Sequence, residues 1–377
     1  MSDSPAQAGA APDPGARRDP SPPSFIRAFP CRACGAKLSF APGTRTLECD
    51  FCGTANDIPE DDGRVEELDL EAYLKSLEDR EEAFVAERLR CARCGAEQEL
   101  PAHHFAAECA YCAAPVVSKD YAGRRIHPRS IVPFQVDRKR AQQEFRRWVA
   151  GLRLAPNELK RYAQSDAAMK GTYLPYWTYD CHTESDFRGE RGEDHYEQQQ
   201  VRTSKGVEMR RVVRTDWFPV EGRVERFHDD VLVPASRSLA SSLRGAAMGW
   251  NLNGLVAYRP EYVSGYRGEA YEVSLREGYP AAKEVIDANI HSMIRARIGG
   301  DRQRVISVST RYADVRFKHV LLPVWVSAYR FKDKTYRFLV NGQTGEVAGE
   351  SPLSWFKVTW LVVGVLLFFL LAYLFSR

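Results

Sequence analysis

The sequence predicts an α+β protein in three parts: two small cysteine-rich modules, an α+β domain with a largely antiparallel sheet, and one apolar C-terminal helix. Three observations predict this order. Cys-x-x-Cys pairs repeat near the N-terminus, strand-like and helix-like patterns fill the middle, and an uncharged apolar run lies near the C-terminus. The expected boundaries are a disordered tail at 1–23, a first module at 24–56, an acidic linker with a short helix at 57–87, a second module at 88–118, the α+β domain at 126–351 and a terminal helix at 355–375.

The four Cys-x-x-Cys pairs form two copies of one pattern. In each copy fourteen residues separate the pairs, and the second copy lies sixty residues after the first. Two short loops that each carry two thiolates can complete one tetrahedral Zn²⁺ site, and the spacing is one residue shorter than the usual template. The sequence therefore predicts two tandem Cys₄ zinc ribbons. The predicted ligands of the two structural Zn²⁺ ions are Cys31, Cys34, Cys49, Cys52, Cys91, Cys94, Cys109 and Cys112.

Other interpretations of these cysteines are less favoured. Disulfides need an oxidising compartment, and residues 1–23 contain neither an apolar h-region nor a cleavage motif of a signal peptide. Tetrahedral sulfur also suits iron, so a rubredoxin-like site is the main alternative. Catalytic zinc is not expected, because four thiolates leave no open position for water. His103 and His104, at the tip of the second hairpin, are expected to be exposed.

The tail and the linker differ in composition. Residues 1–23 are rich in Ala, Pro, Ser, Gly and Asp without an apolar period, which predicts disorder. The linker is acidic, and four of its apolar residues recur at helical spacing, which predicts a short amphipathic helix. We expect this apolar stripe to pack on a neighbouring ribbon, with a partner-binding helix as the alternative. The four residues are Leu70, Tyr73, Leu74 and Leu77.

Strand and helix patterns alternate through the α+β domain. Strands are expected at 131–136, 173–187, 196–201, 207–215, 305–317, 321–331 and 336–340. Helices are expected at 138–151 with Asp137 as N-cap, at 238–248, and from Pro280 to Ile298 before Gly299 and Gly300. Asn341-Gly342 fits a tight turn.

A fainter repeat lies inside this domain. The segment Lys170–Trp177 resembles Lys318–Trp325, and both contain the pattern Leu-Pro-x-Trp. A proline at the beginning of a strand costs no ladder hydrogen bond, and the tryptophan two residues later shares its face. We expect a duplicated β-unit whose tryptophans meet in one core, and the alternative is a ligand cleft between the two halves.

The C-terminal run predicts a transmembrane helix. Val358 to Phe375 contains eighteen residues without charge, which span about 27 Å as a helix, close to the hydrocarbon thickness of a bilayer. Trp355, Trp360 and Tyr373 lie near its borders, as interfacial aromatics do. A buried soluble helix is the alternative. Cations before the span favour a single-pass C-terminal anchor in the inner membrane, with the N-terminal bulk in the cytoplasm. These cations are Arg330, Lys332, Lys334, Arg337 and Lys357.

The order of parts resembles a known family. Ribbon, acidic helix and ribbon are followed by the strings LPYWTYD, DDVLVPASRSL, LLPVWVSAYR and YRFLVNGQTGEV, and then by the apolar helix. This is similar to a bacterial family of membrane-anchored double zinc-ribbon proteins of unassigned function. Its members are often labelled after the primosomal protein N′ helicase or after transcription-factor zinc ribbons. No stretch has the form G-x-x-x-x-G-K-[ST], so we expect no ATP-driven helicase activity.

No catalytic residues are predicted. Cys181 and His182 are adjacent on an expected strand, so their side chains point to opposite faces and cannot form a nucleophile–base pair. The group His228-Asp229-Asp230 and the pair Asp194-His195 could bind metal, but turn chemistry explains them more simply.

Three function classes follow. The favoured one is a non-enzymatic, membrane-tethered scaffold whose ribbons and acidic helix recruit a cytosolic protein partner. The second is nucleic-acid binding, although the net charge of +3 alone does not imply it. The third is an unknown ligand-binding or enzymatic activity in the domain with the Leu-Pro-x-Trp repeat. A basic run supports the second class, or contact with anionic lipid headgroups. This run contains Arg124, Arg125, Arg129, Arg138, Lys139, Arg140, Arg146 and Arg147.

Overall fold

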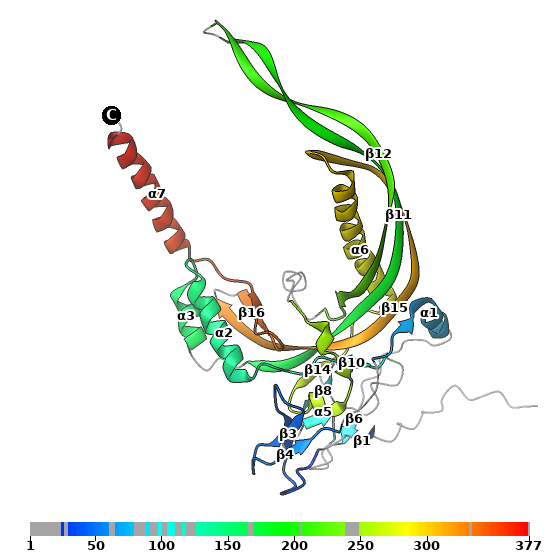
Figure 1. Cartoon of the computed structure of the whole chain (residues 1–377). Coiled ribbons are helices and arrows are strands. Elements are labelled where there is room, and N and C mark those ends of the chain that lie inside the picture. Colours follow the sequence, from blue (N-terminus) through cyan, green and yellow to red (C-terminus); the bar gives the residue numbers. More distant parts are fainter. Residues whose placement is uncertain are drawn as a thin grey trace, which may run out of the picture.

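Three long antiparallel strands form the framework of the protein (Figure 1). They are β11 (Lys170–Thr203), β12 (Gly206–Pro234) and β15 (Arg302–Phe331), with β11 between the other two. The strands bend together around helix α6 (Leu275–Ile298), which lies on the concave face of the sheet (Figure 1). The computed structural model describes residues 24–25, 29–59, 65–78, 88–90, 97–99, 104–109, 115–117, 126–164, 169–203, 206–237, 249–331 and 334–375.

Alternating burial explains how the long sheet holds α6. Between Cys181 and Gly189 the odd-numbered residues of β11 are buried, whereas the even-numbered ones are exposed or half-exposed. The period of two places the odd-numbered side chains on one face of the strand. Helix α6 presents a stripe of buried residues at helical spacing. The stripe contains Leu275, Gly278, Ala282, Ile286, Ile290, Ile294 and Ile298.

The sequence-based predictions divided these strands too finely. The strands predicted at 173–187 and 196–201 are parts of β11, and the one at 207–215 is part of β12. The strands predicted at 305–317 and 321–331 are one strand, β15. Polar residues, glycine and proline predict breaks between these segments. In the structure the strands continue at those positions because they pair with neighbouring strands. Bulges occur where the register shifts.

The two Leu-Pro-x-Trp motifs pair with each other in the middle of the sheet. Leu174 lies directly opposite Leu322, so a local two-fold axis relates the two copies. Trp177 and Trp325 lie in one continuous core, as predicted, and each indole N–H donates to a backbone carbonyl oxygen at 2.9 Å. The two leucines are 1% and 0% exposed, so the junction of the halves is packed core where the alternative prediction placed a ligand cleft.

Both prolines of the motif lie inside a strand, which differs from the predicted position at its beginning. Pro175 follows the residues that pair with β14 (Arg267–Glu269) and precedes those that pair with β12. Pro323 lies between the residues that pair with β10 (Ser130–Ile131) and with β16 (Lys334–Asn341). Each proline therefore lies where one side of its strand has no ladder partner, so its missing N–H breaks no hydrogen bond there.

Helices α2 (Arg138–Gly151) and α3 (Asn157–Gln164) pack beside β16 and β17 (Val347–Gly349) at the other end of the sheet (Figure 1). The predicted bounds of α2 are confirmed. Its predicted N-cap is also confirmed, because Asp137 Oδ1 accepts the N–H of Arg140 at 2.7 Å.

Helix α6 begins earlier than predicted. Ser274 and Glu277 form a capping box, so the first helical residue is Leu275 and Pro280 lies inside the helix. Gly299 ends the helix in the left-handed region with φ 68°, as predicted.

Two further predicted elements differ in the structure, and a third lies outside the described residues. The strand predicted at 131–136 reduces to β10, although Val132, Phe134 and Val136 beyond it are buried. The two-residue turn predicted at Asn341-Gly342 is a longer loop, because the N–H of Asn341 donates to Glu346 O and the left-handed glycine is Gly345. The helix predicted at 238–248 lies outside the described residues.

The linker helix docks on the long sheet. β5 (Leu68–Asp69) pairs with β15, and α1 (Leu70–Glu78) follows it directly. The Tyr73 ring meets Phe317 edge to face at 5.2 Å. The short helix is confirmed, but its apolar stripe packs on β15, whereas the prediction placed it on a neighbouring ribbon.

The cysteine-rich segments form small sheets at one end of the molecule. The first module contains β2 (Leu38–Phe40), β3 (Thr46–Cys49) and β4 (Ala55–Asp57) in one antiparallel sheet. In the second repeat β8 (His104–Glu108) pairs with β9 (Pro115–Val117) and with β14, which joins both to the main sheet. The remaining elements are β1 (Ser24–Phe25), β6 (Arg88–Arg90), β7 (Glu97–Glu99), η1 (Leu252–Gly254), β13 (Val256–Ala257) and α5 (Pro260–Val263).

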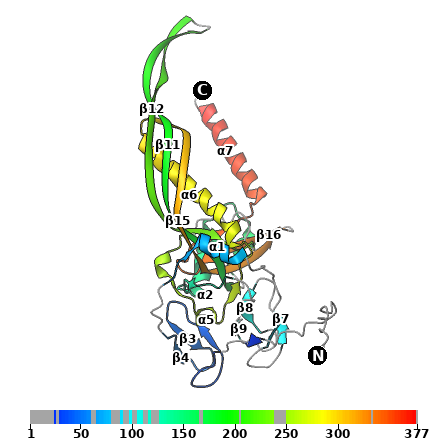
Figure 2. The same cartoon turned by 90° about the vertical axis from the view of Figure 1, so that its right-hand side faces the viewer.

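The apolar C-terminal helix α7 (Trp355–Phe375) stands away from the body. Its 21 residues have a mean hydropathy of 2.6 in the most apolar window, and none is buried. One helix among the described residues is thus long and apolar enough to cross a membrane. Both views show α7 pointing away from the β2–β3–β4 sheet, in the same general direction as the long β11–β12 hairpin (Figures 1 and 2).

Candidate metal centre

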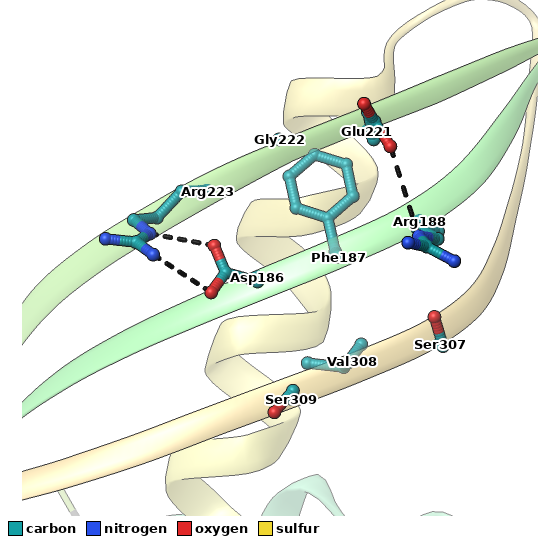
Figure 3. Close-up of a pocket in the computed structure, with 9 residues that line it drawn as sticks. All are labelled: Asp186, Phe187, Arg188, Glu221, Gly222, Arg223, Ser307, Val308 and Ser309. Carbon is teal, nitrogen blue, oxygen red and sulfur yellow. Dashed lines mark hydrogen bonds and ion pairs between the residues drawn. The ribbon is translucent and has the colours of Figure 1, made fainter.

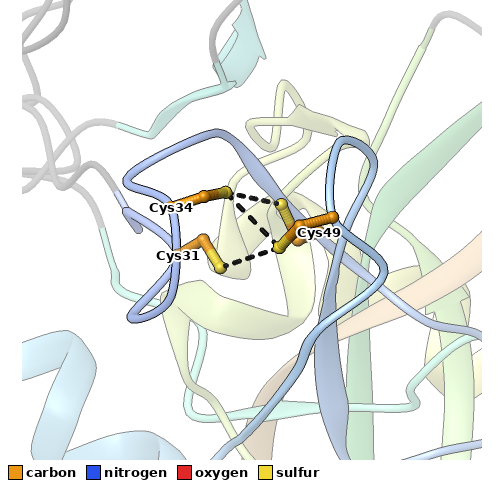
Figure 4. A group of neighbouring side chains, drawn as sticks. Cys31, Cys34 and Cys49 are labelled. Atoms are coloured by element: carbon orange, nitrogen blue, oxygen red, sulfur yellow. Dashed lines mark hydrogen bonds between the residues drawn. The ribbon is translucent and has the colours of Figure 1, made fainter.

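Four cysteines of the first module converge from two similar turns. Gly35, with φ 70°, donates its N–H to Cys31 O at 2.8 Å, and Gly53, with φ 71°, donates to Cys49 O at 2.9 Å. A residue with a Cβ is strained in this conformation, so glycine at each turn lets the chain fold back around its sulfurs. Figure 4 shows the labelled sulfurs pointing toward one another from the two loops.

The distances between the sulfurs suit a tetrahedral metal ion. Cys31 Sγ lies 3.6 Å from Cys52 Sγ, and Cys34 Sγ lies 3.6 Å from Cys49 Sγ and 3.4 Å from Cys52 Sγ. All four ligand atoms lie within 4.8 Å of one another. A metal–sulfur bond of about 2.3 Å gives tetrahedral edges of about 3.8 Å. A disulfide would need about 2.05 Å. The group could therefore hold a metal ion.

Hydrogen bonds from backbone N–H groups lower the pKa of these thiols, whereas burial raises it. The Thr54 hydroxyl lies 3.1 Å from Cys52 Sγ, and this contact, with the Thr54 N–H, lowers the pKa of Cys52 to about 6. The N–H of Cys34 lowers the pKa of Cys31. The N–H of Ala36 favours the Cys34 thiolate, but the neighbouring sulfurs and burial raise the pKa of Cys34 to about 12. Four thiolates in one site therefore need a cation among them.

Asn56 closes the inner side of the site. Its side chain is 6% exposed, and its Nδ2 lies 3.9 Å from Cys31 Sγ. Its Oδ1 accepts the N–H of Arg32 at 3.2 Å. Nothing in the spacing of the cysteines predicts this contact, because it depends on how β4 pairs with β3.

The module is attached to the body through its backbone. The N–H of Phe40 donates to Ser264 O at 2.9 Å, and Ser264 Oγ donates to Leu38 O at 2.8 Å. The Phe40 ring meets Tyr262 at 5.2 Å. Cys31 and Cys49 belong to the same core as these residues, whereas Cys34 and Cys52 are exposed. The four-cysteine group therefore lies at the surface of a module that shares the core of the body.

The second predicted site is only partly within the described residues. Cys109 is buried directly after β8, whereas Cys91, Cys94 and Cys112 lie outside the described residues. Strand β9 lies sixty residues after β4, which agrees with the predicted repeat. Lys37 Nζ pairs with Glu108 Oε1 at 3.3 Å, so the two repeats touch. Of the predicted hairpin-tip histidines, His104 is half-exposed in β8, and His103 is outside the described residues.

The thiol outside the Cys-x-x-Cys pairs, that of Cys181, is buried. Cys181 is buried and His182 is exposed against the ring of Phe227, which confirms that the two point to opposite faces. The cross-strand neighbour of Cys181 is His228, whose Nε2 lies 3.1 Å from Thr183 Oγ1. Burial raises the pKa of Cys181 to about 11, so this thiol stays protonated near neutral pH and is a poor nucleophile.

A buried lysine occupies the carboxylate cluster that includes two members of His228-Asp229-Asp230. Ligand atoms of Asp180, Asp229 and Asp230 lie within 4.8 Å of one another. Lys318 Nζ lies 2.6 Å from Asp230 Oδ1 and 3.6 Å from Asp180 Oδ2. Burial by itself lowers the pKa of Lys318. The hydrogen bond to Asp230 and the negative charges of Asp180 and Asp230 together outweigh this effect, so the pKa of Lys318 lies above its ordinary value. The lysine is therefore the cation of this cluster. No local sequence pattern indicates this contact, because Lys318 is 88 or more residues from these aspartates.

Other predicted groups serve structural roles. Asp194 binds Thr215 Oγ1 at 2.6 Å and Arg302 Nε at 3.1 Å, which ties the β11–β12 hairpin to the start of β15. Within the basic run, Arg129 pairs with Glu66 and Arg147 with Glu144. Arg138, Lys139 and Arg140 are exposed at the start of α2, and Arg124 and Arg125 are outside the described residues.

A shallow cavity of about 590 Å³ lies on the long sheet (Figure 3). Its charged side chains pair with each other: Arg223 with Asp186 through two bonds of 2.8 and 3.0 Å, and Arg188 with Glu221 at 3.9 Å. These pairs leave little to attract a charged ligand. The cavity is lined by Asp186, Phe187, Arg188, Glu221, Gly222, Arg223, Ser307, Val308 and Ser309.

Comparison with known proteins gives one informative match. An uncharacterized protein of Bacillus subtilis (strain 168), YdjG, is 27% identical over 340 residues, which cover 89% of this chain and 92% of the relative. No family model matches the chain. No solved structure matches it either. The relative therefore shows that most of the chain has a counterpart, without assigning a role.

Proposed function

We propose that this protein is a non-enzymatic, membrane-tethered zinc-ribbon scaffold that recruits a cytosolic protein partner. Two structural Zn²⁺ ions hold the ribbons, with Cys31, Cys34, Cys49 and Cys52 as the ligands of the first. Zinc fixes a small rigid surface without a large core. Four thiolates complete its coordination sphere, so this ion is structural.

One spatial relationship carries the proposal. The apolar helix α7 extends from the body in the direction away from the first cysteine module (Figures 1 and 2). A helix of 21 residues spans about 31 Å, enough for a bilayer. With α7 in the inner membrane, the first ribbon faces the cytoplasm, where reducing conditions keep its thiols available for metal.

The body holds the start of the anchor. Lys357 Nζ donates to Ala155 O at 2.7 Å and to Asn157 Oδ1 at 2.9 Å, which ties the first turn of α7 to the α2–α3 loop. The Trp355 and Trp360 side chains are exposed and fit a membrane interface. The cations that precede the span favour the cytoplasmic orientation of the body.

The partner surface is the tip of the first ribbon. Phe51, between Cys49 and Cys52, is 84% exposed, although phenylalanine side chains are usually buried. Exposed aromatic side chains on a rigid support are frequent anchors of protein interfaces. The exposed face of α1, on which Glu71 pairs with Lys75 at 3.0 Å, adds a polar surface beside the body.

In-cell cross-linking of the full chain tests this proposal. We expect the wild type to yield a defined protein partner that the Phe51→Ala variant does not yield while it keeps its zinc. Phe218→Ala is the matched control, since Phe218 is 43% exposed on β12 far from the cysteines. Recovery of the same partner with Phe51→Ala, or with Cys31→Ser, would reject the ribbon as the recruiting surface.

Nucleic-acid binding is the second candidate, supported by the exposed cations at the start of α2. It predicts that the purified full chain in detergent binds DNA or RNA at low salt and releases it as salt rises. Absence of binding at low salt would reject this candidate and leave the scaffold proposal intact.

A further inference from the structure

Two side chains that are not ligands form hydrogen bonds with sulfurs of the first ribbon. The Cys52 thiol donates to Thr54 Oγ1 at 3.1 Å, and Asn56 Nδ2 donates to Cys31 Sγ at 3.9 Å. A thiolate that binds metal has no proton, so beside such a sulfur the Thr54 hydroxyl is the donor. These contacts reach one cysteine of each Cys-x-x-Cys pair. Both donors come from one short segment at β4, whose pairing with β3 fixes their distance from the sulfurs.

The orientation of Asn56 is set by its other contacts. Its Oδ1 accepts the N–H of Arg32 at 3.2 Å, and its Nδ2 donates to Thr54 O at 3.1 Å. Since only the oxygen can accept that N–H, the amide nitrogen must face Cys31 Sγ. With 6% exposure, the amide has little room to turn away.

Such contacts strengthen a thiolate metal site. Four thiolates around Zn²⁺ carry a net charge of −2, and a donor near a sulfur stabilises part of that charge. Groups that bind the ligands of a metal commonly change its affinity by about 10- to 100-fold when they are removed.

The second repeat provides an internal comparison. The residues sixty positions after Gly53, Thr54 and Asn56 are Ala113, Ala114 and Val116. Neither Ala nor Val has a side-chain donor, so the sequence of the second repeat lacks both contacts.

We infer that Thr54 and Asn56 are positioning residues and that, because of them, the first cysteine site releases its metal more slowly than the second. The inference rests on the proposed zinc. The first site holds the module that shares the core of the body, so slow metal loss there keeps the ribbon docked.

Zinc release to a colorimetric chelator from the full chain in detergent tests this inference. We expect wild-type protein to release zinc in a fast and a slow phase, with the slow phase absent in Cys31→Ser. The double variant Thr54→Ala/Asn56→Val carries the residues of the second repeat. It should accelerate the slow phase by about 10- to 100-fold. The reciprocal Ala114→Thr/Val116→Asn should slow the fast phase.

Conservative variants separate a hydrogen-bonding role from a packing role. Thr54→Ser keeps the hydroxyl and should keep slow release, whereas Thr54→Val keeps the shape and should lose it. Thr44→Ala is the matched control, because Thr44 Oγ1 donates to Ala41 O and not to a sulfur. Co²⁺ substitution adds a spectroscopic measure, since loss of the donors should shift the sulfur-to-cobalt charge-transfer band.

The outcomes distinguish this inference from the proposed function. Unchanged release from Thr54→Ala/Asn56→Val and from Thr54→Val would overturn the inference, and so would slow release assigned to the second repeat. Wild-type protein with no bound zinc would overturn the proposed metal itself. Zinc content and circular dichroism of each variant establish that it is folded and loaded before release is timed.

Discussion

Lys318 Nζ lies 3.1 Å from Glu67 Oε1, although 251 residues separate the two in the chain. Glu67 belongs to the acidic linker, and Lys318 lies within β15. The same ammonium reaches Asp180 and Asp230, so one lysine joins the linker to two strands of the long sheet. Beside this contact, β5 pairs with β15 at Phe317. The acidic linker is therefore part of the folded body.

Removal of the Lys318 ammonium should destabilise the protein. Lys318 is 6% and Asp180 1% exposed, so Lys318→Met leaves buried carboxylates without their cation. Breaking a buried ion pair from one side typically costs about 3 kcal/mol.

Urea unfolding of the full chain in detergent measures this loss. Arg311→Ala is the control, because its pair with Glu184 is largely exposed and should contribute less than about 1 kcal/mol. Equal effects of the two substitutions would contradict the role given to Lys318.

Asp180 should make stability depend on pH. Burial raises the pKa of Asp180 to about 6 in the folded state, against an ordinary value of 3.8. Between these values the folded state keeps a proton that the unfolded state has lost, so the free energy of unfolding falls as pH rises through this window.

Asp180→Asn removes this titration and keeps the oxygen that accepts the N–H of Asp230. The stability of the variant relative to the wild type should therefore rise from pH 4 to pH 7 in urea unfolding at fixed ionic strength. A difference that stays constant across this range would show that Asp180 has an ordinary pKa.

Tyr73→Ala should loosen the linker helix without unfolding the body. The ring of Tyr73 meets Phe317 edge to face at 5.2 Å, and such pairs contribute about 1 kcal/mol beyond their buried area. Faster amide hydrogen exchange is expected across 68–78, with the α6 amides unchanged. Unchanged exchange in the linker would mean that Leu70 and the β5 pairing hold it alone.

Cys49→Ser should lower the zinc content of the purified protein and loosen the docking of the first module. Cys49 is 1% exposed at the end of β3 and shares the core with Leu38. We expect faster amide exchange at 38–40 and around Ser264, because the proposed Zn²⁺ holds the fold of the module.

Cys181→Ser is the matched control for this loss. Cys181 is equally buried but lies on the long sheet, away from the other cysteines, so the variant should keep its zinc. Equal zinc content in the two variants would argue against the four-cysteine site.

Local and periodic features could be predicted from the sequence. The two cysteine pairs at Cys31 and Cys49 imply convergence, because two thiolates in one short turn need two more to complete a tetrahedral site. The apolar C-terminal run predicts a helix long enough to cross a membrane, and Asp137 marks the start of α2. In each case the signal lies within a few residues or in a spacing, where near neighbours decide the conformation.

The extent of the long strands depends on pairing between segments that are distant in the sequence. The strands β11 and β15 continue through Pro175 and Pro323 because their neighbours end at those positions, and no local pattern contains that information.

By itself, the sequence determined which residues are chemically able to bind metal or cross a membrane. The tertiary structure alone decided that Asn56 faces Cys31, that Lys318 neutralises Asp180 and Asp230, and that the linker joins the sheet. The physical reason is that side-chain type sets which bonds a residue can make, whereas strand register and packing between distant segments set which partner comes within reach.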